Sequence, residues 1–184
     1  AVIAKCPPRF TFSGVGDLLS KYSAAHDWTL AYWENGAQVN DFAVLIALQS
    51  VENFVNYPTK SIADLDFIKL MAGALVMSGV AMEVSGSSRP ASGSEHLISH
   101  AYDKVAPSPS MHGLQVGLAS IATMWLQEHP RLEDVMAVLA ETGFLGFVKK
   151  NPLDRSAFIE SIRLAPSIKD DYFTILSPPG NVER

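Results

Sequence analysis

The stretch Leu70 to Met82, LMAGALVMSGVAM, contains no charged residue and lies between Lys69 and Glu83. It is shorter than the roughly 20 apolar residues that a membrane span needs, so we interpret it as part of a buried helix. Ser61 followed by Asp64 forms a near capping box and predicts where this helix begins. Because the helix is apolar nearly all round, we expect it at the centre of the fold.

Helical patterns continue on both sides of this stretch. Apolar residues recur at three- and four-residue spacing over 39–57, which predicts a helix that Pro58 ends. Further helices are expected from the turn at 13–16 to before Asn35, and at 95–104, 111–128, 132–142 and 155–164. Pro7 and Pro8 are expected to keep the first 12 residues irregular. Strand patterns are almost absent, so the sequence predicts an all-α bundle of about seven helices in a single domain, 1–184.

Two loops separate the predicted helices in the middle of the chain. Residues 85–94, SGSSRPASGS, are small and polar, so we expect a flexible loop whose Ser94 caps the following helix. Residues 107–110, with alternating proline and serine, predict a second loop.

Composition excludes several classes of function. The chain has 184 residues, 48% of them hydrophobic and 18% charged, which suits one domain with a sizeable core. Its formal net charge of −5 argues against a nucleic-acid partner, and its basic residues form no membrane-binding stripe. The one cysteine, Cys6, excludes a disulfide framework and a thiolate zinc cage, so we expect a reducing, cytoplasmic compartment.

Three histidines, His96, His100 and His112, lie within 17 residues of one another. His96 and His100 are four positions apart and share a helical face, whereas His112 opens the next predicted helix. A tight loop between the two helices can aim His96 and His112 at one point, and imidazole is the commonest metal ligand. A pair of histidines at this spacing is weak evidence by itself, because most such pairs are solvated or hydrogen-bonded within the fold; the third histidine strengthens the metal hypothesis.

A catalytic metal site with three protein ligands would also need a carboxylate. Spacing leaves five candidates open, namely Asp17, Asp27, Asp41, Glu95 and Asp103. Asp17 taken by itself is more typical of an acid that caps a helix N-terminus or stabilises the helix dipole than of a metal ligand.

The segment 85–117, SGSSRPASGSEHLISHAYDKVAPSPSMHGLQVG, strongly resembles the metal-binding region of sn-glycerol-1-phosphate dehydrogenases. These enzymes share a superfamily with glycerol dehydrogenase, iron-dependent alcohol dehydrogenases and dehydroquinate synthase. The segment 14–31 resembles the first helix of that group's C-terminal domain. The HxxxH and HG motifs are common to the superfamily, whereas SRPASGSEH is the specific part. The resemblance covers most of the chain, from about Pro8 to Glu128, and implies the all-α fold of that domain.

The resemblance also implies roles for individual residues. Asp17 matches the carboxylate ligand of the metal, and His96 and His112 match the two histidine ligands. His100 matches a histidine that faces the substrate without binding the metal. Lys21 stands where iron-dependent relatives place a further histidine ligand; a charged lysine cannot bind a metal, so the resemblance favours zinc. Lys21 could also neutralise a substrate phosphate.

The implied reaction interconverts dihydroxyacetone phosphate and sn-glycerol 1-phosphate with NAD or NADP. Zinc would bind oxygens of the small phosphorylated polyol and lower the pKa of its reacting hydroxyl. His100 could relay the proton, and Arg89 with the loop serines could line the cleft. No membrane takes part in this reaction.

Two departures from the family pattern matter. Leu114 replaces the acid that relatives usually carry after the HG motif. The chain also lacks the N-terminal nucleotide-binding α/β domain of the superfamily, so we expect it to be one domain of a larger enzyme, with that domain as its partner. A homo-oligomer is possible. Alternative hypotheses are a dehydroquinate-synthase-like or glycerol-dehydrogenase-like enzyme domain, or a non-catalytic helical scaffold domain.

Overall fold

The computed structural model describes residues 2–108 and 110–183, and within them it contains nine α-helices and no strand. The predicted all-α class is therefore confirmed, with two helices more than expected. The helices are α1 (Pro8–Leu19), α2 (Lys21–Asn35), α3 (Asp41–Val55), α4 (Leu65–Ser85), α5 (Ser94–Val105), α6 (His112–Leu126), α7 (Leu132–Glu141), α8 (Phe144–Lys150) and α9 (Arg155–Leu164). Short 3-10 helices span Ile3–Lys5, Ala165–Ser167 and Asn181–Glu183. Pro109, in the predicted 107–110 loop, lies outside the described residues.

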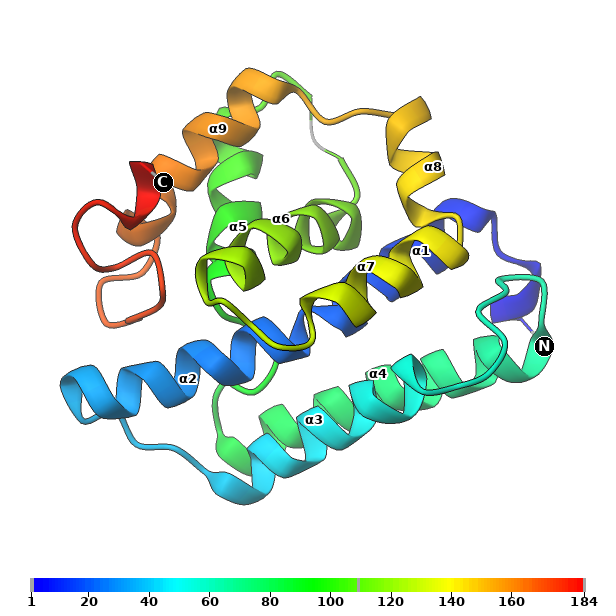
Figure 1. Ribbon diagram of the computed structural model, residues 1–184, viewed down its shortest axis with the longest axis horizontal. Coiled ribbons are helices and arrows are strands. Elements are labelled where there is room, and N and C mark those ends of the chain that lie inside the picture. Colours follow the sequence, from blue (N-terminus) through cyan, green and yellow to red (C-terminus); the bar gives the residue numbers. More distant parts are fainter. Residues whose placement is uncertain (1, 109, 184) are drawn as a thin grey trace.

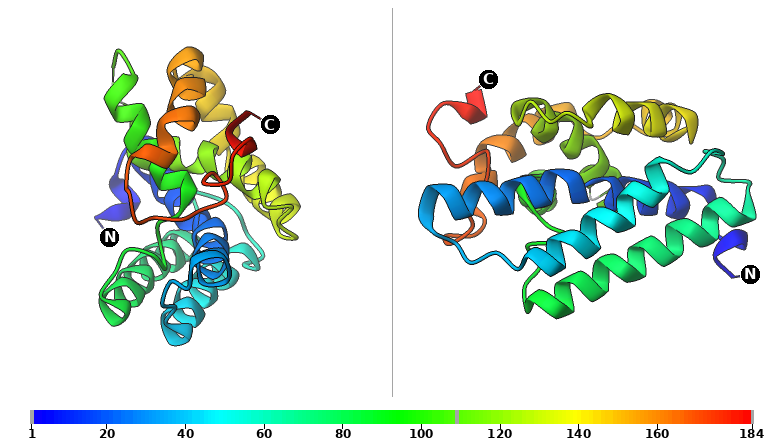
Figure 2. Two further views of the ribbon diagram at one scale, coloured as in Figure 1. Left: turned by 90° about the vertical axis from the view of Figure 1, so that its left-hand side faces the viewer. Right: turned by 60° about the horizontal axis from the view of Figure 1, so that its bottom comes forward.

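The helices are arranged around a central pair. Helices α1 and α2 run nearly end to end through the molecule, with the antiparallel pair α3 and α4 on one side and α5 to α9 on the other (Figure 1; Figure 2, right). The main core gathers apolar side chains of α1, α3, α4, α6, α7 and α8. A second, smaller core joins α5 and α6 to α9 and the C-terminal segment.

Helices α1 and α6 are in close backbone contact. A methyl group at Gly16 of α1 would overlap the carbonyl oxygen of Gly113, and one at Gly113 would overlap the carbonyl oxygen of Ser13. One turn further along α6, Gly117 faces Gly16 in the same way. These glycines let the two backbones approach each other at the start of α6. The same contact sets Asp17 beside His112.

Helix α4 differs from its prediction in place and in length. It is 21 residues long and begins after Asp64, whose Oδ1 accepts hydrogen bonds from the amides of Asp66 and Phe67, so Ser61 does not start it. It lies at the edge of the molecule, with Val76 67% exposed, because only one face packs against α3 and α1. By length and composition α4 would suffice to cross a membrane, and 33% of that apolar window is buried in this fold.

The first helix and the eighth also differ from the sequence analysis. Helix α1 begins at Pro8 and passes through the predicted turn at 13–16. A proline at the first helical position needs no amide partner and has a suitable φ, so Pro8 starts the helix rather than preventing it. Helix α8 was not predicted; it is only seven residues long and follows Gly143, whose φ is +87°.

The loop 85–94 is present, but its second half is buried rather than flexible and solvated. Residues 89–94 are all buried, and Arg89 is only 7% exposed. Ser94 does not cap α5, because its hydroxyl has no hydrogen-bond partner in the structure; Gly93 occupies the cap position instead. The loop therefore forms a fixed wall at the start of α5.

We expect Gly16→Ala to lower the free energy of unfolding by about 1–3 kcal/mol, because the added methyl forces α1 away from α6. Gly73→Ala is the matched control, since it lies within α4 and its added methyl would meet no neighbouring side chain or other helix within 4 Å, and it should stabilise the protein slightly. Urea unfolding of both variants measures the difference. Equal effects of the two substitutions would contradict the close packing of α1 on α6.

Candidate metal centre

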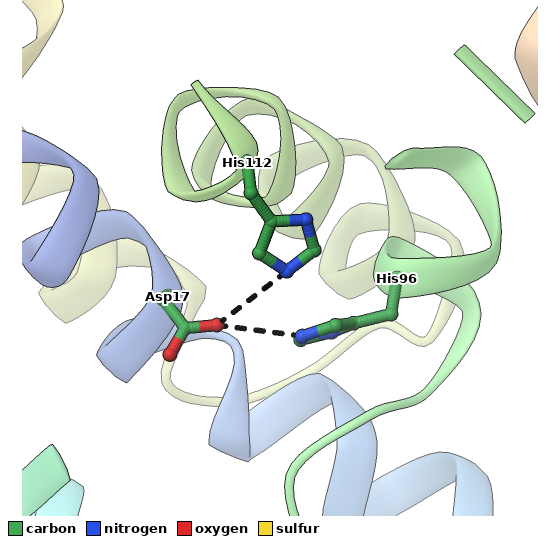
Figure 3. A group of neighbouring side chains, drawn as sticks. All are labelled: Asp17, His96 and His112. Carbon is green, nitrogen blue, oxygen red and sulfur yellow. Dashed lines mark ion pairs between the residues drawn. The ribbon is translucent and has the colours of Figure 1, made fainter. Parts of the chain in front are cut away.

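Three side chains converge from three helices, and they are the three that the family resemblance implies as ligands (Figure 3). Asp17 lies in the last turn of α1, His96 in the first turn of α5, and His112 at the start of α6. The Asp17 Oδ1 atom is 3.3 Å from His96 Nε2 and 4.0 Å from His112 Nε2. All three potential ligand atoms lie within 4.8 Å of one another.

The far side of each imidazole ring is held by a hydrogen-bond acceptor. His96 Nδ1 lies 2.8 Å from Glu95 Oε1, a carboxylate that can only accept, so Nδ1 carries the proton. His112 Nδ1 lies 2.9 Å from Ser99 Oγ, which itself donates to Gln115 Oε1 and therefore accepts from the ring. In the neutral form of each ring, the Nε2 lone pair faces Asp17.

This donor set fits a divalent cation. Two imidazole lone pairs and a carboxylate oxygen repel one another unless a positive charge lies between them. A tetrahedral zinc ion with bonds of about 2.0–2.1 Å would set its ligand atoms about 3.3 Å apart, close to the 3.3 and 4.0 Å found here. Three protein ligands leave a position open for water or substrate, as in catalytic sites.

The charges around the site keep Asp17 ionised. Burial by itself would raise the pKa of Asp17, but the Lys21 ammonium, with Nζ 3.5 Å from Oδ2, and the two histidines hold that pKa well below its ordinary value. Burial would likewise lower the pKa of His96, yet its hydrogen bonds to Asp17 and Glu95 raise it. Without a metal, a proton can thus take the cation's place at His96, and metal binding must displace it.

Glu95 is the most deeply buried group of the site, with a fully buried side chain. Its Oε1 atom accepts hydrogen bonds from the Gly93 amide at 2.7 Å and from His96 Nδ1. Burial opposes its charge, but the His96 contact and the Gly93 amide outweigh burial and lower the pKa of Glu95. Of the five acids left open by spacing, Asp17 is the one that joins the cluster, and Glu95 supports it from behind.

The other candidate acids have separate surroundings. Asp27 is fully buried and accepts hydrogen bonds from the amides of Ser94 at 2.6 Å and Ile175 at 2.8 Å, and from the Gln127 side chain at 3.0 Å. Burial and the nearby Glu95 raise the pKa of Asp27 to about 6. Asp27 therefore ties α2 to the start of α5 and to the C-terminal segment. Asp41 lies in the first turn of α3, and Asp103 accepts a hydrogen bond from Gln115.

A cavity of about 330 Å³ lies beside the cluster, lined by Asp17, His96, His100 and Lys21 among others. The exposed His100 lies with its ring centre 6.0 Å from that of His112. Burial, followed by the positive charges of His96 and Lys169, lowers the pKa of His100.

Lys21 is not an exposed helical lysine, since its side chain is 2% exposed. Its Nζ atom donates to Ser20 Oγ and to the Ala91 carbonyl, both at 3.2 Å, and pairs with Asp17. Leu114 is 5% exposed and belongs to the main core, so this position does not line the cavity.

Sequence reasoning missed the residues that orient the ligands. Glu95 was considered only as a ligand, although an acid next to a ligand histidine is a usable signal for such support. Ser99 and Gln115 gave no signal, because their roles depend on the packing of α5 against α6. Lys169, which lines the cavity from the C-terminal segment, was also missed.

The fold and this cluster define an all-α domain in which three potential ligands could hold a metal ion. No family model matches the chain. Curated relatives do: it is 37% identical over 184 residues to glycerol-1-phosphate dehydrogenase [NAD(P)+] of Staphylothermus marinus, covering 100% of this chain and 52% of the relative. The enzyme of the same name from Haloquadratum walsbyi is 39% identical over 186 residues, and the match covers 96% of this chain and 51% of the relative.

The enzyme of the same name from Thermococcus kodakarensis is 34% identical over 180 residues, and the match covers 97% of this chain and 51% of the relative. The chain spans about half the length of the curated relatives it matches. The resemblance seen in segment 85–117 is thus confirmed. Nearly all residues of the chain align with about half the length of each of these glycerol-1-phosphate dehydrogenases.

We expect Glu95→Ala to weaken zinc affinity about 10- to 100-fold, because His96 loses the acceptor that holds its Nδ1 proton and ring orientation. Glu95→Gln keeps the side-chain volume and should lose less zinc affinity than Glu95→Ala. Competition titration with a chelating dye measures the affinity, and melting of the metal-free proteins shows whether they remain folded. The control is Glu133→Gln at an exposed position of α7, which should bind zinc like the unmodified chain. Unchanged affinity in a folded Glu95→Ala protein would contradict this role.

Proposed function

We propose that the chain is the C-terminal, metal-binding half of a cytoplasmic NAD(P)-dependent dehydrogenase that interconverts dihydroxyacetone phosphate and sn-glycerol 1-phosphate. The observation that carries the proposal is the convergence of Asp17, His96 and His112, with both ring Nε2 atoms directed at the carboxylate. The names of the relatives supply the substrate and the cofactor. The nicotinamide nucleotide is held mainly by the other half of the enzyme.

The proposed metal is zinc. Lys21 is four residues after Asp17 on the same side of the site. Its ammonium already contacts Asp17, the Ser20 hydroxyl and the Ala91 carbonyl, so it adds no fourth metal ligand. Two imidazoles and one carboxylate are a set that zinc accepts. When bound, the metal supplies Lewis-acid polarisation of the hydroxyl or ketone oxygen of the substrate.

The surrounding side chains prepare the site for this substrate. Lys21 keeps Asp17 ionised and holds its Oδ2 atom, which leaves Oδ1 toward the two histidines. His100 lies in the cavity wall, and its lowered pKa favours the neutral ring, in which one nitrogen can accept the proton of the reacting hydroxyl. In the reverse direction the same ring returns the proton.

Metal analysis of the purified chain tests the site. We expect about one zinc ion per chain, lost in His96→Ala and in His112→Ala, because two remaining ligands hold zinc poorly. His26→Gln, outside the cluster, is the control and should keep its zinc. A folded protein that binds no zinc at neutral pH would contradict the proposal and favour a scaffold domain.

Enzyme assays test the reaction. In a protein that joins this chain to its nucleotide-binding half, we expect dihydroxyacetone phosphate to be reduced with NADH or NADPH, and His100→Ala to lower kcat about 100-fold or more as a lost proton-transfer group. Dihydroxyacetone without phosphate is the control substrate. Preference for that substrate would indicate a glycerol-dehydrogenase-like enzyme, and cyclisation of a heptulosonate phosphate would indicate dehydroquinate synthase chemistry.

A further inference from the structure

One side of the cavity beside the metal centre carries Lys169, which comes from the C-terminal segment. Ser88 and Ser92 of the 85–94 loop and Lys169 line it together with Asp17 and His96. Its volume of about 330 Å³ is at the small end of the range for ligand sites, which suits a compact substrate.

Two cations near this cavity are already engaged. The Lys21 ammonium has three donors and three partners, so it has none to spare. Arg89 donates to the carbonyl oxygens of Phe173 at 2.8 Å and Asp171 at 3.4 Å, and its guanidinium lies 3.6 Å from the ring centre of Tyr172. Lys21 would have to break one of its contacts to bind a ligand, and Arg89, whose guanidinium is directed at the C-terminal segment, is not among the described residues that line the cavity.

Lys169 is in a different position. Its ammonium lies 4.4 Å from the same Tyr172 ring, and among the described residues it has no hydrogen bond and no ion pair with a carboxylate. Burial, followed by the charge of Arg89, lowers the pKa of Lys169. Among the described residues, neither of the two cations that share this ring forms an ion pair with an acid, in a chain whose net charge is −5.

Tyr172 also fixes the loop that faces Lys169. Its hydroxyl donates to the Ser92 carbonyl oxygen and lies 3.4 Å from Ser88 Oγ. One aromatic side chain therefore positions the lysine and the two serines on the same wall.

We propose that Lys169, assisted by the Ser88 and Ser92 hydroxyls, forms an anion subsite that binds the phosphate group of a phosphate monoester whose other end reaches the metal centre. The identification of that ester as a triose or glycerol phosphate rests on the proposed function. A lysine binds phosphate as a point charge, and hydroxyl donors add direction. The subsite accounts for the unpaired charge and assigns the phosphate to Lys169 rather than to Lys21.

Phosphate binding to the 184-residue chain tests the subsite, first without zinc and then with it. We expect inorganic phosphate and sn-glycerol 1-phosphate to bind in isothermal titration, and Lys169→Met to weaken both about tenfold or more, as for one lost charge-assisted hydrogen bond. Lys169→Arg should retain most of the affinity. Lys149→Met, an exposed lysine in the last turn of α8, is the matched control and should change nothing. Zinc content should be equal in all four proteins.

The outcomes separate the subsite from the metal centre. Loss of phosphate binding in Lys169→Met supports the subsite even if the chain proves to bind no zinc, in which case the proposed function alone fails. Unchanged phosphate affinity in Lys169→Met, or no binding of inorganic phosphate and sn-glycerol 1-phosphate to the unmodified chain, overturns the subsite while zinc stoichiometry still tests the function. Binding of nicotinamide mononucleotide in place of sn-glycerol 1-phosphate would assign the anion to the cofactor and overturn the proposal as well.

Discussion

The close contact of α1 with α6 is the constraint on which the site depends. Gly16, Gly113 and Gly117 remove the side chains that would separate the two helices. As a result the last turn of α1 reaches the first residue of α6, and Asp17 faces His112. A wider spacing would leave the same residues on the same helices, but the carboxylate could not share one cation with the imidazole.

Buried polar groups then fix the remaining ligand. The start of α5 is enclosed by the 85–94 loop, where two carboxylates are fully buried. Both oxygens of Asp27 accept hydrogen bonds from backbone amides, and Glu95 accepts through Oε1 from the Gly93 amide and from His96. A buried carboxylate is costly unless it is paired, so these groups tolerate few alternative arrangements. Glu95 orients the His96 ring, and Asp27 ties the start of α5 to the C-terminal segment.

Several errors of the sequence analysis have one physical source. Helix α4 reads as a central helix because it is apolar nearly all round, but this part of the chain covers only one of its faces and leaves Val76 exposed. Pro8 and the glycines at 14 and 16 read as helix breakers, yet a first-position proline and glycines at a helix contact are compatible with α1. A local sequence pattern indicates which secondary structure a segment can form, but it does not indicate which other segments pack against it.

Residue order alone determined the all-α class, most helix boundaries and the histidine pair, since these follow from local periodicity and capping. The continuous segment 85–117 also showed the resemblance to the glycerol-1-phosphate dehydrogenases. Only the tertiary structure decided that Asp17 meets His96 and His112, that Glu95 and Ser99 hold the two rings, and that Lys169 reaches the same cavity. These contacts join residues up to about 150 positions apart, and such distances are set by how helices pack, which no local pattern encodes.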